Sequence, residues 1–172
     1  YQIAGAGPLV LLLHGFGEDS QVLQHNFDAL QTSYRVILPD LPGSGKSPLQ
    51  PAVAHSIDEM GNAMHALIQS ISNQPCTILG HSMGGYIALA MAEKHPQCLQ
   101  ALGLLHSTAF ADSEEKKETR RQAIHIIRQK GAAYFLKTAI PGLFTTAFTQ
   151  QHPATVAALV QQGELFDDAA LI

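Results

Sequence analysis

Charged residues, cysteines and long hydrophobic runs are all scarce in this chain of 172 residues. No stretch approaches the roughly 18 consecutive apolar residues of a membrane span. The first residues lack the charged segment and apolar core of a signal peptide, although a mature protein whose signal peptide was removed starts in the same way. The two cysteines, Cys76 and Cys98, are too few for a disulfide scaffold. Each opens an apolar run, so we expect reduced core thiols and a cytoplasmic location.

The charge balance gives little support for polyanionic partners. Charged residues make up 14% of the chain, and the formal net charge is −4. We therefore expect neither nucleic acid nor an anionic membrane as a partner. The basic residues are unevenly placed, since only Arg35, Lys46 and Lys94 precede residue 108. This uneven placement indicates a change of structural role near residue 107.

Four short apolar runs predict strands that are buried on both faces of a parallel sheet. They cover residues 8–13, 34–38, 76–79 and 99–105. Helical patterns lie between the runs, at 20–30, 56–71 and 83–94. The second helix has a capping box in Ser56 and Glu59. This alternation predicts an α/β fold with a mostly parallel, doubly wound sheet.

The pattern changes after residue 107, where only helices are expected. Asp112 with Glu115 is predicted to cap a long charged helix that ends before Gly131. The expected helices cover 113–130, 132–139 and a segment from Pro153 onward. We therefore divide the chain into residues 1–107 and 108–172. Six apolar side chains of the later segment line a pocket or, as the more frequent alternative, form a helix–helix core: Phe110, Tyr134, Phe135, Leu143, Phe144 and Phe148.

The sequence LGHSMGG at residues 79–85 places one serine between glycines, where an apolar run gives way to a helical pattern. A serine hydroxyl is a poor nucleophile unless it is exposed, fixed and beside a base. A tight turn from strand to helix exposes the hydroxyl and points backbone N–H groups at a developing oxyanion. Residues 80–84 match the pattern G-x-S-x-G for such a turn. The alternative for Ser82 is an ordinary helix N-cap.

This motif and two others resemble those of the α/β-hydrolase superfamily. HGFG at residues 14–17 resembles the family's oxyanion loop, and DLPGSGKS at residues 40–47 resembles its D-x-x-G-x-G-x-S turn. The resemblance implies that Ser82 is the nucleophile and that the backbone N–H groups of Phe16 and Met83 bind the oxyanion. Phe16 has a second interpretation, a pocket-lining aromatic. Residues 108–172 resemble the start of a cap domain.

The resemblance implies a serine-dependent hydrolase that acts on a small ester or related acyl substrate through an acyl-enzyme at Ser82. Thioesterases, lactonases, C–C bond hydrolases and lyases have similar elbows, so the motif leaves the reaction type open. The alternative of a different class is a non-catalytic small-ligand receptor or interaction module with the same fold.

Three histidines, His14, His81 and His106, are expected to line the pocket rather than to transfer protons. His106 ends a predicted strand at the same sheet edge as the elbow, where a general base is the less favoured alternative. In the family the triad acid and histidine follow later strands, and this sequence has no pattern for those strands. We therefore expect the acid and base beyond Ile172, the C-terminal strands to be missing, and the fragment alone to be inactive.

One stretch is similar to part of a nucleotide-binding site. GSGKS at residues 43–47 ends like a phosphate-binding loop, but a Walker A loop requires glycine where this chain has Asp40. Pro48 and Pro51 also oppose the helix that would follow such a loop. No group of His, Cys or carboxylate residues has metal-ligand spacing. We therefore expect neither a metal nor an organic cofactor.

Overall fold

A computed structural model describes residues 1–49 and 56–172 of the chain. Pro51, one of the two prolines that oppose a phosphate-binding helix, lies outside these residues. The chain forms two compact units, Tyr1–Phe110 and Ala111–Ile172, each with a hydrophobic core of its own. The sequence placed this division between residues 107 and 108.

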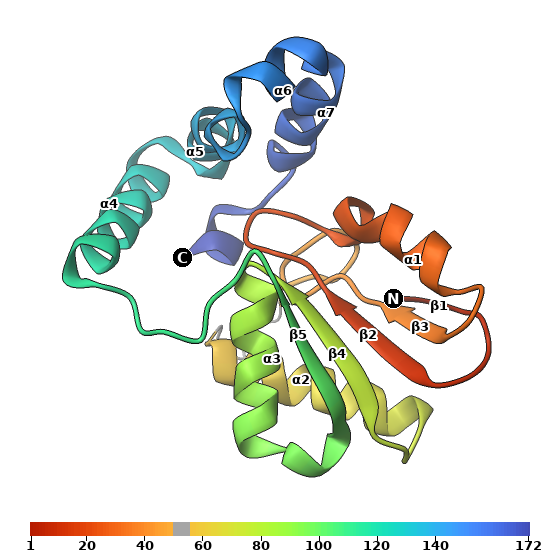
Figure 1. Cartoon of the computed structure of the whole chain (residues 1–172). Coiled ribbons are helices and arrows are strands. Elements are labelled where there is room, and N and C mark those ends of the chain that lie inside the picture. The colour runs from red at the N-terminus through yellow and green to blue at the C-terminus, as the bar shows by residue number, and fades with distance from the viewer. Residues whose placement is uncertain (50–55) are drawn as a thin grey trace. The chain divides into compact units, whose positions relative to one another are not determined.

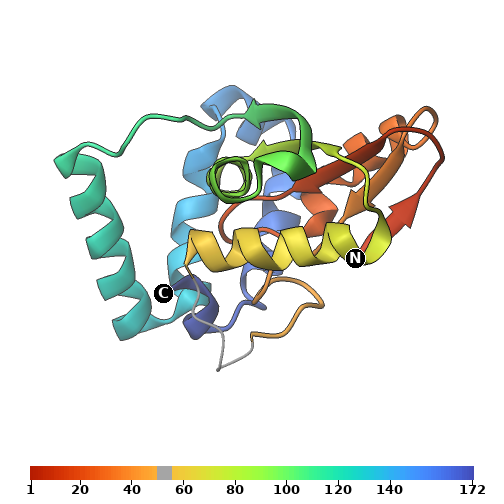
Figure 2. The same cartoon turned by 90° about the horizontal axis from the view of Figure 1, so that it is seen from below.

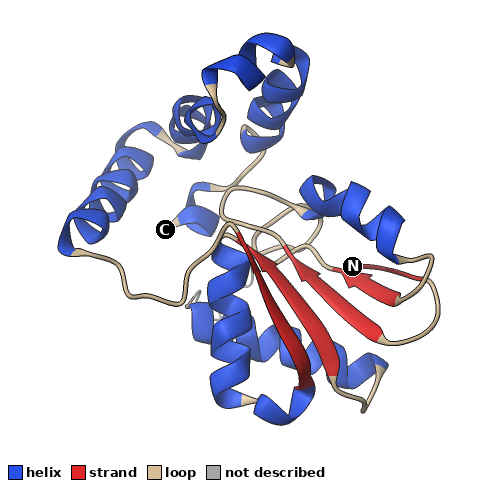
Figure 3. Cartoon of the chain, in the orientation of Figure 1, coloured by secondary structure: helices blue, strands red, loops and turns tan. Residues whose placement is uncertain are grey.

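The first unit is built on a five-stranded sheet with the order β1-β3-β2-β4-β5 (Figure 3). The strands are β1 (Gln2–Ala4), β2 (Leu9–Leu13), β3 (Arg35–Leu38), β4 (Cys76–His81) and β5 (Leu99–Leu105). Strands β2 to β5 run parallel, and only β1 is antiparallel to its neighbour β3. The predicted α/β fold with a mostly parallel sheet is therefore confirmed. The short β1 was not among the predicted strands.

Helices cover both faces of this sheet (Figure 1). They are η1 (Ser20–Leu23), α1 (Gln24–Leu30), α2 (Ile57–Ile71), α3 (Met83–Lys94) and η2 (Pro96–Cys98). Leu9, Leu11 and Leu13 of β2 pack with α2 and α3, whereas Val10 and Leu12 pack with η1 and α1. Helix α2 lies against α3. In Figure 2, α3 is seen end-on and α2 lengthwise. Because alternate side chains of a strand point to opposite faces, a continuous apolar run fills both cores.

Local signals set the helix boundaries in the first unit. The Ser56 hydroxyl accepts a hydrogen bond from the Glu59 N–H, and the Glu59 carboxylate accepts one from the Ser56 N–H. The predicted capping box is therefore present. Helix α3 covers the predicted residues 83–94 and has buried residues on several sides. Its nearly uniform apolar surface accordingly predicted a buried helix.

The second unit is helical. Its elements are α4 (Glu114–Lys130), α5 (Ala132–Ala139), η3 (Ile140–Leu143), α6 (Thr146–Gln151), α7 (Pro153–Gly163) and η4 (Asp168–Leu171). The predicted cap of α4 was wrong by one residue, because Ser113 accepts the hydrogen bond from the Lys116 N–H. Asp112 lies one residue too early for this position and forms ion pairs with Lys116 and Arg120. Within residues 1–49 and 56–172, no helix has the length and apolarity to cross a bilayer.

The apolar side chains of the second unit divide between core and surface. Phe135 and Phe144 pack against its core, and Phe144 stacks on Phe148 with ring centroids 5.1 Å apart. Tyr134 and Leu143 are 49% and 72% exposed. The alternative of a helix–helix core therefore holds for part of the predicted set only.

Candidate active site

Ser82 lies in a sharp turn between β4 and α3. Its backbone has φ 50° and ψ −116°, a conformation that costs a residue with a side chain about 1–3 kcal/mol. Ser82 donates its N–H to the Leu105 carbonyl at 2.9 Å. Its own carbonyl accepts hydrogen bonds from the Gly85 N–H at 2.9 Å and from the Ser107 hydroxyl at 2.8 Å. Backbone bonds to β5 and α3 therefore hold the strained turn in place.

The Ser82 side chain does not cap the helix that follows it. Ser82 occupies the N-cap position of α3, yet within the described residues its hydroxyl makes no capping hydrogen bond. An ordinary N-cap serine accepts a hydrogen bond from an early helical N–H. The geometry therefore differs from the N-cap interpretation, and it leaves the hydroxyl partly exposed at the carboxyl end of the sheet.

Gly84 brings the start of α3 against the end of β2. A Cβ atom at this position would collide with the carbonyl oxygens of Leu13 and His14. A Cβ atom at Gly80 would likewise collide with the backbone of Gly84. Only glycine allows this approach, which packs the elbow directly on the strand that leads into the predicted oxyanion loop.

His14 is fully buried and bonded to backbone through both ring nitrogens. Its Nε2 accepts a hydrogen bond from the Leu41 N–H at 2.9 Å, and its Nδ1 lies 3.0 Å from the Gly15 carbonyl oxygen. Because an N–H group can only donate, Nε2 carries no proton and Nδ1 donates to Gly15. Burial lowers the pKa of His14 and favours this neutral form. The predicted pocket-lining role does not fit a ring with no exposed surface.

Glu18 connects the loop after β2 with the elbow. One of its carboxylate oxygens, Oε2, accepts a hydrogen bond from the Gly15 N–H at 2.7 Å and lies 2.9 Å from His81 Nδ1. The hydrogen bond to Glu18 raises the pKa of His81 despite the opposing effect of burial. His81 therefore forms an ion pair with Glu18 when it is protonated.

Asp40 closes the D-x-x-G-x-G-x-S turn. Its carboxylate accepts hydrogen bonds from the N–H groups of Ser20 and Lys46, each at 2.9 Å. Burial alone would raise the pKa of Asp40, but the two backbone bonds and the Ser20 hydroxyl together contribute to a lowered pKa. The Lys46 N–H, which a phosphate-binding loop would offer to its ligand, is thus already bound to a carboxylate. The motif has a structural function here.

The remaining predicted residues lie at the same edge of the sheet. Met83 is the first residue of α3, whose early N–H groups have no partner within the helix. Phe16 is 39% exposed. His106 directly follows β5, is exposed, and meets the His81 ring edge-on with centroids 6.1 Å apart. The oxyanion role of Phe16 and Met83 and the pocket-lining role of His81 and His106 stay predictions.

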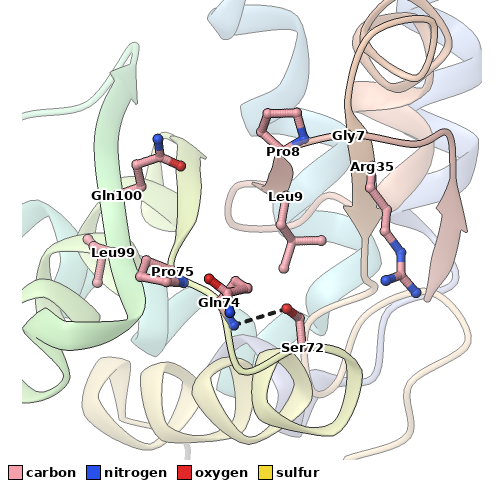
Figure 4. Close-up of a pocket in the computed structure, with 9 residues that line it drawn as sticks. All are labelled: Gly7, Pro8, Leu9, Arg35, Ser72, Gln74, Pro75, Leu99 and Gln100. Atoms are coloured by element: carbon pink, nitrogen blue, oxygen red, sulfur yellow. Dashed lines mark hydrogen bonds between the residues drawn. The ribbon is translucent and has the colours of Figure 1, made fainter.

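A cavity of about 540 Å³ lies at the amino ends of the parallel strands, opposite the end that carries Ser82 (Figure 4). Leu9, Arg35 and Leu99 begin strands β2, β3 and β5 and line it, and Pro75 precedes β4. Because these strands are parallel, their amino ends are a strand length away from the elbow. This cavity is therefore separate from the site around Ser82.

Two residues of the site were not predicted from the sequence. The Ser107 hydroxyl holds the Ser82 carbonyl, and the Glu18 carboxylate bridges Gly15 and His81. Ser107 follows β5, whose carboxyl end lies beside the Ser82 turn. This position in the sequence could have indicated its contact with Ser82. In the described part of the chain, no group of three or more His, Cys, Asp or Glu residues is arranged to hold a metal ion.

Comparisons with known proteins agree with this geometry. The sequence profile of the alpha/beta hydrolase fold matches residues 8–134. A pimeloyl-[acyl-carrier protein] methyl ester esterase of Aeromonas hydrophila is 39% identical over 98 residues, which are 57% of this chain and 37% of that protein. The chain thus spans less than half of this curated relative.

Solved structures extend the likeness to nearly the whole chain. A thermophilic esterase from Thermogutta terrifontis, in a malate-bound structure, has a TM-score of 0.89 at 31% identity, over 99% of this chain and 62% of that one. The enol-lactonase from Burkholderia xenovorans has a TM-score of 0.89 at 21% identity, over 99% of this chain and 65% of that one. The second likeness shows the fold alone. The profile match and the elbow geometry together show that the chain belongs to the α/β-hydrolase fold family.

Proposed function

We propose that the protein is a serine hydrolase that cleaves a small carboxylic ester, a lactone or a related acyl compound. The observation that carries the proposal is the strained, partly exposed Ser82 turn, whose hydroxyl is left out of helix capping. The esterase and lactonase among the similar proteins support an acyl substrate.

In the proposed reaction, the Ser82 oxygen attacks the carbonyl carbon while its proton passes to a base. The negative charge that develops on the carbonyl oxygen is stabilised by the N–H groups of Met83 and Phe16. The bond to the leaving oxygen then breaks, and that oxygen takes the proton from the base. Water attacks the acyl-enzyme by the same steps, releases the acid and restores Ser82.

A general base for Ser82 is required by this mechanism. The hydrogen bonds of His14, His81 and His95 go to other groups, namely backbone, Glu18 and Asn62. We infer that a base outside these contacts activates Ser82. The test therefore uses the protein at its full natural length, since this chain spans 62% of the solved esterase.

A fluorophosphonate probe tests the nucleophile directly, with mass spectrometry to locate the label. We expect stoichiometric labelling of Ser82 and none in Ser82→Ala, and we expect hydrolysis of p-nitrophenyl butyrate to fall by about 10³-fold or more in that variant. Ser70→Ala, which changes an exposed serine of α2, is the matched control and keeps both signals. A folded protein that never labels favours the small-ligand receptor instead.

A further inference from the structure

Glu18 holds two backbone segments of the site together although it belongs to neither motif that forms them. Its Oε2 atom is shared between the Gly15 N–H at 2.7 Å and His81 Nδ1 at 2.9 Å. The side chains of Glu18 and His81 are only 17% and 24% exposed. The contact with His81 joins residues 63 positions apart, so one oxygen atom connects the loop after β2 with the elbow.

The space around this oxygen is available only because residue 15 is glycine. A Cβ atom there would lie 2.8 Å from Glu18 Oε2 and 3.2 Å from His81 Nδ1. The first distance is shorter than any ordinary contact and the second is tight. A side chain at Gly15 would therefore push the carboxylate away from one or both of its partners.

The loop is held from both sides of Gly15. Its N–H donates to Glu18, and its carbonyl accepts from His14 Nδ1. The next peptide is trans and planar, so the N–H of Phe16 points opposite to the Gly15 carbonyl. The His14 contact thus sets the direction of the Phe16 N–H, and the Glu18 contact holds the peptide unit that precedes it.

We propose that Glu18 is a positioning residue for acyl transfer, which sets the predicted oxyanion donor Phe16 relative to Ser82 by joining Gly15 to His81. The inference rests on the proposed function of Ser82. Glu18 touches neither the reacting atoms nor Ser82 itself. It acts through the backbone of the loop and through the residue that precedes the nucleophile.

This function predicts a particular kinetic signature. An oxyanion forms only in the transition state, so a misplaced donor lowers kcat and leaves KM nearly unchanged. We expect Glu18→Ala to lower kcat by about 10- to 100-fold, less than the complete loss of a donor costs. Glu18→Gln keeps an oxygen that accepts from Gly15 but loses the charge, so it restores part of kcat.

A double-mutant cycle with His81→Ala tests the connection. If the carboxylate acts by joining the two segments, the double variant is no slower than the slower single variant. Glu93→Ala removes an exposed carboxylate from α3 and serves as the matched control with unchanged kcat. Circular dichroism establishes that each variant is folded, and Glu18→Gln carries the test if Glu18→Ala does not fold.

NMR titration of His81 supplies a readout that does not depend on activity. The titratable groups that face this ring are Glu18 and His106. We expect the His81 pKa to fall in Glu18→Ala and Glu18→Gln, whereas Glu93→Ala leaves it unchanged.

The possible outcomes separate the two proposals. If Ser82 labels but Glu18→Ala matches Glu93→Ala in kcat, or if the Glu18 and His81 effects multiply, the positioning role is overturned. If folded wild-type protein does not label at Ser82, the proposed function fails, and the positioning role fails with it. If Ser82 labels, and the kcat losses of the Glu18 and His81 variants do not multiply in the double variant, both proposals are supported.

Discussion

The two units of the chain use their polar side chains in different ways. In the first unit, three polar side chains at the carboxyl ends of the strands bond to backbone: His14 to Leu41, Asp40 to Lys46, and Ser107 to Ser82. In the second unit, α4 carries exposed pairs between charged side chains, such as Glu114 with Lys117 and Glu118 with Arg121.

The polar side chains of the first kind determine the conformation of loops, whereas those of the second kind lie on the exposed surface of a helix. A side chain bonded to a loop N–H or carbonyl fixes the backbone that forms the site, and its loss leaves a buried polar group without a partner. An exposed ion pair contributes little, because water and salt replace it. We therefore expect the first unit to tolerate few changes near Ser82, and the exposed face of α4 to tolerate many.

The largest expected contrast is between two glycines. Gly84→Ala would place a Cβ atom against the backbone oxygens of Leu13 and His14, so β2 and α3 must separate. We expect a loss of about 4 kcal/mol or more in the free energy of unfolding, or failure to fold. Gly142→Ala in η3 is the matched control, because its Cβ would meet nothing within 4 Å.

Urea denaturation of both variants measures this contrast. The control is expected to change the free energy of unfolding by less than about 1 kcal/mol. Equal stability of the two variants would contradict the close packing of the elbow on β2.

The sequence predicted those features whose signals are local. The apolar run of β2, the Ser56 capping box and the strand-to-helix turn around Ser82 each lie within a few residues, and all are present. Helix α6 was missed because its six residues include none that are buried, so it has no apolar stripe. The cap of α4 was misplaced by one residue because Asp112 and Ser113 are both good capping residues.

The contacts of the candidate site were harder to predict because they join distant residues. Glu18 bonds to a histidine 63 positions away, and His14 bonds to Leu41 across 27 positions. No periodic pattern links such pairs, and only the folded sheet brings their loops to one edge. The sequence therefore predicted the position of Ser82 in a turn but not the side chains that hold the turn and the neighbouring loop.

A smaller effect is expected from Asp40, and it depends on pH. Asp40→Asn keeps one acceptor oxygen for the two N–H donors, Ser20 and Lys46, and is expected to cost about 1–3 kcal/mol at pH 7. Because the folded pKa of Asp40 is lowered, this difference is fully present above the ordinary carboxyl pKa near 3.9. It disappears as the pH falls through the folded value.

Thermal unfolding between pH 7 and pH 2 measures this dependence. Asp28→Asn changes an exposed carboxylate of α1, so it should follow wild type over the whole range. If the difference in thermal stability between wild type and Asp40→Asn stays constant down to pH 2, the ionised Asp40 carboxylate does not stabilise the turn.

The smallest effect on the free energy of unfolding is expected on α4, where an exposed ion pair contributes little. The side chains of Lys117 and Glu114 are 47% and 80% exposed and form an ion pair with nitrogen and oxygen 2.7 Å apart. Lys117→Gln keeps a similar helix propensity and should cost about 0.2–0.5 kcal/mol. The cost should vanish in 1 M salt, where charges are screened within about 3 Å. A cycle with Glu114→Gln isolates the pair, and a coupling as large as the Asp40→Asn effect would remove the distinction between the two units.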